Sequence, residues 1–129
     1  MDIIVPLTEN YEFRRVYARG KSAVRPSLVA YCMKRGGAAP RIGITASKKI
    51  GNAVKRNRAR RLLRESARTL YPAIRPGVDI VLVSRGKTPF MHCGTVLTEM
   101  TSALEELGVL VSAAKNRAKP EKTASEKRT

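Results

Sequence analysis

The stretch from residue 53 to residue 70 constrains this chain more than any other, because its apolar and basic residues repeat with the period of an α-helix. At about 100° per residue, the small and apolar side chains fall in one arc of such a helix. They are Ala59, Leu62, Leu63, Ser66 and Leu70. The opposite arc holds Arg56, Asn57, Arg60, Arg61, Arg64 and Arg68. One side can therefore be buried against a sheet while the other presents its guanidinium groups.

The flanking residues indicate where this helix begins and ends. Asn52 is suited to cap its N-terminus, and Pro72 cannot continue it. The preceding loop adds Lys48 and Lys49, and the amides and dipole of a helix N-terminus favour an anion at the same place. The loop lacks the two-glycine spacing of a nucleotide-binding P-loop, so we do not expect it to bind a nucleotide.

The basic face has almost no acidic partner in its own segment. Residues 41–68 contain a single acid, Glu65, within a chain of formal net charge +16. Like charges four residues apart destabilise a helix by about 0.2–0.5 kcal/mol per pair, so such a face is costly unless an anion binds to it. Arginine also matches phosphate oxygens with two parallel hydrogen bonds. The pattern therefore favours a polyanionic partner, most often nucleic acid, over a merely solvated face.

The other segments alternate between helical and extended patterns. Thr8 and Gly20 delimit an expected helix over residues 9–17. Two expected strands, 28–33 and 41–46, can form a hairpin across residues 34–40, and the segment before them is a loop or short edge strand. Residues 78–83 are nearly all apolar, as in a strand inside a sheet. Residues 96–107 then predict an amphipathic helix.

This order of elements predicts an α+β sandwich, a sheet covered by helices. Residues 1–112 form one expected domain, since the whole chain has only 129 residues. Residues 113–129 change to a composition rich in Lys, Arg, Ala and Ser, which predicts a basic, disordered tail. No apolar run approaches the roughly 20 residues of a membrane-spanning helix, so no membrane partner is expected.

Residues that could carry out catalysis are scarce. The acids do not form a compact metal-binding pattern, and Asp79 is interpreted as a strand-edge carboxylate. His92 is the sole histidine and is expected to be structural. Cys32 is expected in the core, and Cys32 and Cys93 are too few for a disulfide framework or a four-cysteine zinc site, which favours a reduced, cytoplasmic protein. We therefore expect no catalytic residue and no metal ligand from the protein itself.

The sequence of residues 41–64 closely resembles the signature of the bacterial ribonuclease P protein subunit. Its centre is the motif Arg56-Asn57-Arg58, followed by further arginines, and the resemblance covers roughly residues 7–110. It implies an αβββαβα two-layer sandwich of the ribosomal protein S5 domain 2-like type. It also implies helices packed on a mostly antiparallel four-stranded sheet, with a left-handed βαβ crossover that departs from the usual hand.

The resemblance further implies the activity, which is Mg²⁺-dependent endonucleolytic removal of the 5′ leader from precursor tRNA. In that family a catalytic RNA holds the Mg²⁺ ions and performs the hydrolysis, while the protein binds this RNA and the leader. The implied contacts to the catalytic RNA are Lys48, Lys49, Arg56, Asn57, Arg58, Arg60, Arg61, Arg64 and Arg68. The implied leader-binding residues are Phe13, Tyr17, Val29, Tyr31 and Thr45. Tyr17 stands where phenylalanine is common in the family.

Three alternatives remain at the level of sequence. A ribosomal or other structural RNA-binding protein would share the positive charge without needing a leader cleft. A self-sufficient protein nuclease is disfavoured by the scattered acids. A DNA-binding module is least favoured, since no helix-turn-helix pattern is present.

Overall fold

The structure, a computed structural model, describes residues 5–7, 9–37 and 39–111. Three α-helices are present in these ranges: α1 (Asn10–Arg19), α2 (Ala53–Leu70) and α3 (Cys93–Leu107). The strands are β1 (Val5–Pro6), β2 (Lys21–Val24), β3 (Leu28–Lys34), β4 (Arg41–Thr45) and β5 (Val78–Ser84). Short 3₁₀ helices are η1 (Lys48–Ile50), η2 (Tyr71–Ala73) and η3 (Thr88–Phe90). The tail predicted over residues 113–129 lies outside the described residues.

The helix boundaries follow local capping chemistry. The side chain of Asn52 accepts a hydrogen bond from the backbone N–H of Lys55 at 3.0 Å, which confirms it as the cap of α2. Helix α1 is instead capped by Glu9, which forms a reciprocal capping box with Glu12. The first helix therefore begins after Glu9 rather than after Thr8, because the box satisfies backbone donors at both positions.

The predicted hairpin between residues 28–33 and 41–46 is wrong. The strand order is β1-β4-β5-β3-β2, so β5 lies between β3 and β4. It runs antiparallel to β3 and parallel to β4. Strand β5 is almost wholly buried, and the centre of the sheet is where a continuous apolar strand loses the most contact with water. Segment 21–27 supplies the antiparallel edge strand β2, one of its two expected forms.

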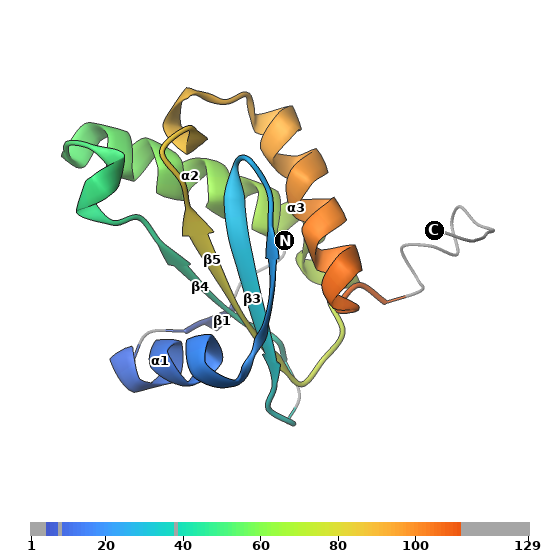
Figure 1. The fold of residues 1–129 in the computed structure, drawn as a ribbon. Helices are drawn as coiled ribbons and strands as arrows, with labels where there is room; N and C mark the ends of the chain where they lie inside the picture. Colours follow the sequence, from blue (N-terminus) through green and yellow to red (C-terminus); the bar gives the residue numbers. More distant parts are fainter. Residues whose placement is uncertain (1–4, 8, 38, 112–129) are drawn as a thin grey trace.

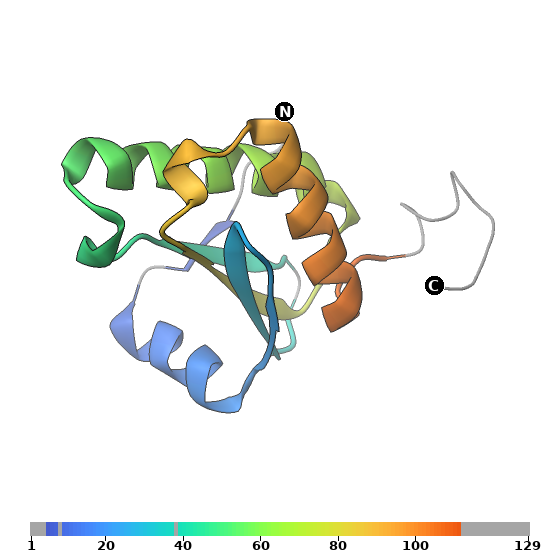
Figure 2. The same ribbon diagram turned by 45° about the horizontal axis from the view of Figure 1, so that its top comes forward.

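The α+β class is confirmed, with differences in detail. The two-residue strand β1 pairs parallel with β4 and gives the described sheet five strands instead of four. Helices α2 and α3 form the expected helical layer, and α1 covers part of the opposite sheet face (Figures 1 and 2). The sheet therefore lies between the α2–α3 pair and α1.

The connection from β4 through α2 to β5 joins two neighbouring parallel strands. In Figure 1, α1 lies below the sheet and the fainter α2 lies behind it on the opposite face, and β5 lies to the right of β4 when both strands point upward. A crossover that passes behind the sheet and advances to the right is left-handed, the exceptional hand. Between the end of β4 and the start of α2 lies the short helix η1, which carries Lys48 and Lys49.

The two faces of the sheet are buried unequally. The larger core lies against α2 and α3 and includes Leu28, Leu63, Ile80, Leu82, Met100 and Leu104. On the α1 face, the buried hydrophobic cluster is smaller and consists of Leu7, Val16 and Val81, with Phe13, Tyr31, Met33 and Val83 partly buried around them. Because α1 is short and covers only part of this face, several sheet side chains remain accessible beside it.

An ion-pair cluster fixes α1 to the sheet. Asp79 is fully buried and accepts hydrogen bonds from Arg35 Nε at 2.6 Å and from Arg41 Nε and Nη2 at 3.0 and 2.9 Å. Arg41 also donates to Glu12 of α1 at 2.6 Å. Asp79 does lie near the start of its strand, as interpreted, but the strand is the central one and the carboxylate is buried between two arginines, whose charge it balances together with Glu12.

Candidate nucleic-acid interface

Helix α2 buries the face that its sequence predicts. Ala59, Leu63 and Ser66 are buried, and Ala67 joins them. The motif residues Asn57 and Arg58 are exposed, as are Arg61 and Arg64. The helix therefore rests on the sheet and α3 through small and apolar side chains, and its polar face is turned to solvent.

The arginines of this face differ in what they contact. Arg56 donates to the carbonyl of Gly51 at 2.7 Å, and Arg60 donates to the Asn57 side chain at 3.0 Å. Arg68 is paired with Glu65 at 2.9 Å, and Arg58 donates to the carbonyl of Pro89. Within the described part of the chain, the side chains of Arg61 and Arg64 make no hydrogen bond. These two guanidinium groups are therefore the ones with all their donors available to a phosphate.

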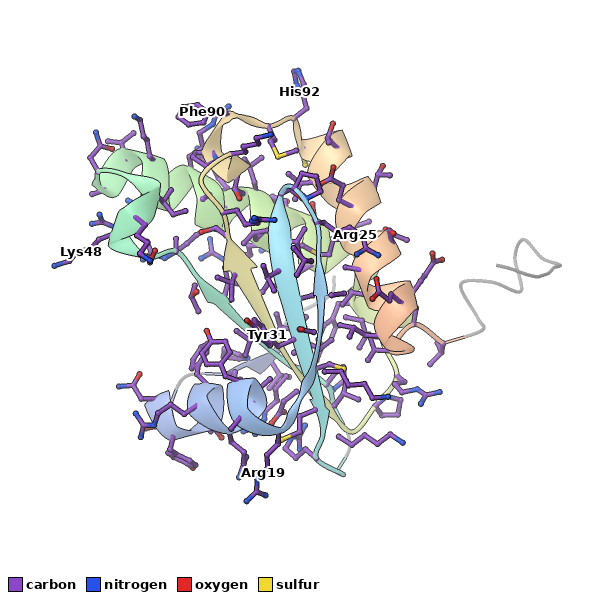
Figure 3. The ribbon with its side chains drawn as sticks, viewed as in Figure 1. Arg19, Arg25, Tyr31, Lys48, Phe90 and His92 are labelled. Atoms are coloured by element: carbon purple, nitrogen blue, oxygen red, sulfur yellow. The ribbon has the colours of Figure 1, made fainter. Side chains whose placement is uncertain are left out.

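The loop before α2 places two more cations, Lys48 and Lys49, at the N-terminal end of the helix. It folds as η1, with the Ser47 hydroxyl accepting from the backbone N–H of Lys49 at 3.3 Å. Gly51 has φ of 138°, a conformation that L side chains rarely adopt, and it allows the sharp turn into α2. Lys48 and Lys49 are exposed, and Figure 3 shows Lys48 pointing away from the molecule.

Phe90 was missed by the sequence analysis. Its ring is 69% exposed at the end of η3, and the Lys55 ammonium lies 5.4 Å from the ring centroid. The link from Arg58 to Pro89 holds η3 against α2 beside this ring. The basic face therefore has an exposed aromatic ring at its border (Figure 3).

The residues expected to bind the leader come together on the α1 face of the sheet. Phe13 and Tyr17 lie one turn apart on α1, and the Tyr17 and Tyr31 rings meet edge to face with centroids 4.9 Å apart. Tyr17 is 41% exposed, whereas Phe13 and Tyr31 are partly buried. A pocket of about 300 Å³, here called the sheet pocket, is lined by Asn10, Phe13, Arg14, Tyr17 and Thr45.

The strand register places the remaining two predicted residues in one row. Val83 of the central strand β5 is paired with Val29 of β3 on one side and with Thr45 of β4 on the other. Directly paired residues point to the same face, so Thr45, Val83 and Val29 form a row across three strands beside the sheet pocket. All three side chains are partly accessible.

The phenol of Tyr17 is held in its neutral form. Burial raises its pKa above the ordinary value, against the opposing effect of a hydrogen bond with Thr45. Tyr17 therefore offers both an aromatic face and a hydroxyl group at neutral pH.

The described residues hold no group of three His, Cys, Asp or Glu side chains that could bind a metal ion. Glu12 and Asp79 are buried in contacts with arginine, which makes them poor ligands. Burial raises the pKa of the Cys32 thiol, in agreement with its expected place in the core. His92 is exposed just before α3, and its side chain makes no cap there. The part of the chain that is described contains no helix long and apolar enough to cross a membrane.

The fold and the two surfaces define a small basic α+β protein with an arginine-rich helix and a partly open, aromatic sheet face. The sequence profile described as Ribonuclease P matches residues 4–108, and the chain belongs to the ribonuclease P protein family.

Individual relatives agree with this assignment. The ribonuclease P protein component of Oceanobacillus iheyensis is 38% identical over 105 residues, which cover 81% of this chain and 87% of the relative. That of Thermoanaerobacter sp. strain X514 is 48% identical over 84 residues, which cover 65% of this chain and 72% of the relative. The solved RNase P protein of Staphylococcus aureus superposes with a TM-score of 0.73 at 27% identity, covering 84% of this chain and 99% of that one.

Proposed function

We propose that this chain is the protein subunit of ribonuclease P and binds two RNA segments at once, the catalytic RNA and the 5′ leader of precursor tRNA. The observation that carries the proposal is the continuity of the two surfaces. Thr45, in the sheet pocket, ends β4, and the chain then passes through Lys48 and Lys49 into α2. An RNA bound on α2 and a strand bound in the pocket would therefore lie next to each other.

The basic face of α2 is the proposed contact with the catalytic RNA. Arg61 and Arg64 supply unpaired guanidinium groups, and Lys48 and Lys49 add charge at the helix N-terminus. Internal bonds orient Arg56 and Arg60 before RNA arrives, which lowers the entropy lost on binding. Binding to phosphates through these groups releases counterions, so the affinity should fall steeply with salt.

The sheet pocket is the proposed contact with the leader. A single-stranded RNA exposes its bases, which stack on aromatic rings with little regard to sequence. Tyr17 is the most exposed ring in the pocket, with Phe13 and Tyr31 supporting it from below. Arg14 adds a cation at the rim for the backbone of the same strand. Mature tRNA lacks the leader and would leave this pocket empty.

The chemistry of cleavage is proposed to lie in the RNA. The described acids are scattered or engaged with arginines, so these residues do not fit a Mg²⁺ site. Phosphate oxygens of a structured RNA are suitable hard ligands for Mg²⁺. The protein would contribute by positioning the precursor and by lowering repulsion between the two RNA chains.

The test is reconstitution with a bacterial ribonuclease P RNA and a leader-bearing precursor tRNA in Mg²⁺. We expect the protein to raise cleavage at the leader junction at low Mg²⁺, and the protein alone to leave the precursor intact. A structural RNA-binding protein would bind the RNA without changing cleavage. Cleavage by the RNA-free protein would favour a self-sufficient nuclease and contradict the proposal.

A further inference from the structure

A pocket of about 460 Å³ lies where the C-terminal ends of α1 and α3 meet one end of the sheet; we call it the rim pocket. It includes Val78 at the start of β5, whereas Thr45 of the sheet pocket is paired with Val83 near the end of that strand. The steps from Val78 to Val83, at about 3.3 Å each, separate these two positions by roughly 16 Å. The rim pocket is therefore distinct from the sheet pocket and from the lysines of η1.

Four cations line the rim pocket, and they come from α1, from two strands and from the segment before β5. They are Arg19, Lys21, Lys34 and Arg75, and all four are exposed. None of them forms an ion pair or a side-chain hydrogen bond with another described residue. The dipole at the C-terminus of α3 is equivalent to about half a negative charge, so it offsets only a small part of theirs.

The acids nearest to the rim pocket do not neutralise it. Asp79, next to Val78, is buried in its contacts with two arginines, and Glu106 of α3 is paired with Arg25 at 2.7 Å. Glu105 is exposed on α3 and does not line the pocket. The chain beyond residue 111 contains six basic residues and two acids, so its composition adds further positive charge. An anionic ligand is therefore the complement of this pocket.

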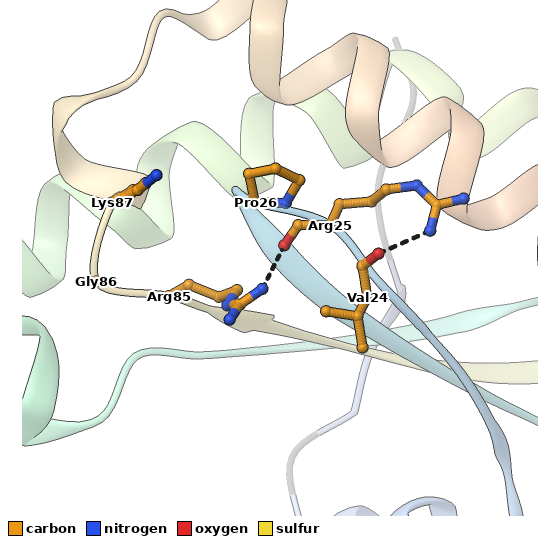
Figure 4. A pocket seen from close by; sticks show the side chains of 6 residues that line it. All are labelled: Val24, Arg25, Pro26, Arg85, Gly86 and Lys87. Atoms are coloured by element: carbon orange, nitrogen blue, oxygen red, sulfur yellow. Dashed lines mark hydrogen bonds between the residues drawn. The ribbon is translucent and has the colours of Figure 1, made fainter.

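The basic pocket at the other end of β2 provides a contrast (Figure 4). There, Arg25 donates to the carbonyl of Val24 at 2.7 Å and pairs with Glu106, while Arg85 donates to the carbonyl of Arg25 at 2.9 Å. These arginines hold the turns after β2 and β5 together. The cations of the rim pocket make no such internal contacts within the described residues, so their replacement should leave the fold intact.

The rest of the rim pocket is mainly aliphatic. Val78 and Val109 are buried, Leu107 is partly buried, and Cys32 is only 8% exposed. Burial raises the pKa of the Cys32 thiol, which is therefore neutral at neutral pH and behaves as a small apolar group. Among the described residues that line the pocket there is no aromatic ring, hydroxyl or amide side chain. A nucleobase would thus have no ring to stack on, whereas an aliphatic side chain would be buried from water.

We propose that the rim pocket is a docking site for an acidic peptide segment of a partner protein, in which carboxylates flank an aliphatic side chain. The carboxylates would bind to the four cations, and the aliphatic side chain would pack on Val78, Leu107 and Val109. An RNA backbone would use the cations alone and leave this apolar surface in contact with water. The site goes beyond the proposed function, because it would recruit a protein through a surface separate from the sheet pocket.

The test is fluorescence anisotropy of a labelled short peptide of alternating glutamate and leucine, titrated with the full chain at physiological salt. We expect saturable binding. A matched peptide with serine in place of leucine should bind at least about tenfold more weakly, because a buried leucine side chain contributes that much or more.

Paired variants locate the binding. Lys34→Ala/Arg75→Ala should weaken the glutamate–leucine peptide by about 3- to 20-fold, the range for two exposed charge pairs, and Arg19→Ala/Lys21→Ala should do the same from the other side of the pocket. Arg61→Ala/Arg64→Ala removes the same charge from α2 and should change the affinity little. Addition of the catalytic RNA should leave the peptide bound.

Other results would overturn the proposal. Equal weakening by the rim-pocket and α2 variants would reduce the binding to a general attraction by the positive charge of the chain. Equal affinity for the leucine and serine peptides would remove the apolar surface from recognition. Displacement of the peptide by a single-stranded RNA oligonucleotide, with the oligonucleotide itself weakened by Lys34→Ala/Arg75→Ala, would make the pocket an RNA site instead.

Discussion

The replacement Gly43→Ala tests whether α1 and the sheet pocket are built as described. Gly43 lies on β4 beneath the Phe13 ring, and an added Cβ would stand 2.5 Å from both Cε1 and Cζ of that ring and 3.2 Å from Leu7 Cβ. Favourable carbon–carbon contacts lie near 3.5–4.0 Å, so the ring would have to move by about 1 Å or more. The sheet pocket, which Phe13 lines, gives the ring space to move into.

The size of the effect follows from two opposing terms. Overpacking a well-filled site costs about 1–3 kcal/mol. Alanine is favoured over glycine within a strand by about 0.5–1 kcal/mol, which offsets part of this cost. We therefore expect Gly43→Ala to lower the free energy of unfolding by about 1 kcal/mol, measured by urea denaturation. The displaced ring should also weaken precursor binding more than binding of mature tRNA.

A double-mutant cycle isolates the contact. Phe13→Leu removes the two ring atoms that the new Cβ would meet, so in the double variant Gly43→Ala should cost much less. The expected coupling is about 1 kcal/mol, in the range found for residues in direct contact. Strictly additive effects, or a Gly43→Ala protein more stable than the wild type, would refute the packing of Phe13 on Gly43.

Two further predictions concern charge. Replacing Arg61 and Arg64 with alanine should reduce the slope of log affinity for the catalytic RNA against log salt by about 1.5, since each phosphate contact contributes about 0.7–0.9. The variant Lys34→Ala/Arg75→Ala removes the same charge from two exposed residues outside the basic face of α2 and should change that slope little, and an equal change in both would contradict the assignment. Burial alone would raise the pKa of Asp79, but hydrogen bonds from its two arginine partners outweigh this and hold the pKa below the ordinary 3.8. The stability that Asp79 contributes is therefore present above pH 3.8 and is lost as the pH falls through the lower folded value. Asp79→Asn should lower the free energy of unfolding at neutral pH by about 3 kcal/mol and flatten its acid dependence in urea titrations; an unchanged acid limb would be inconsistent with the buried pair.

The sequence was most informative where a pattern depends on local geometry. Helical periodicity was enough to predict which face of α2 is buried, and Asn52 was correctly identified as its cap. Ala67, next to the predicted arc, joined the buried face because α3 also packs on α2. The grouping of Phe13, Tyr17 and Tyr31 came from the family resemblance, since each ring alone has the properties of a core residue.

Features that depend on contacts distant in sequence were not predictable. The position of β5 between β3 and β4 reverses the simplest hairpin, and nothing local distinguishes the two arrangements. The burial of Asp79 and its pairing with Arg35 and Arg41 were not predicted because these partners are about 40 residues away in sequence. Exposure of Phe90 was missed for a similar reason, since it follows from the docking of η3 on α2.

The central claim is that the protein makes the complex recognise the leader. The most direct measurement is the affinity of the catalytic RNA for precursor and mature tRNA, with and without this protein, at fixed salt and Mg²⁺. We expect the protein to favour the precursor by about tenfold or more, as one or two stacked bases allow, and Tyr17→Ala to remove most of that preference while Tyr17→Phe retains it. Equal strengthening of both tRNAs by the wild-type protein would contradict the account.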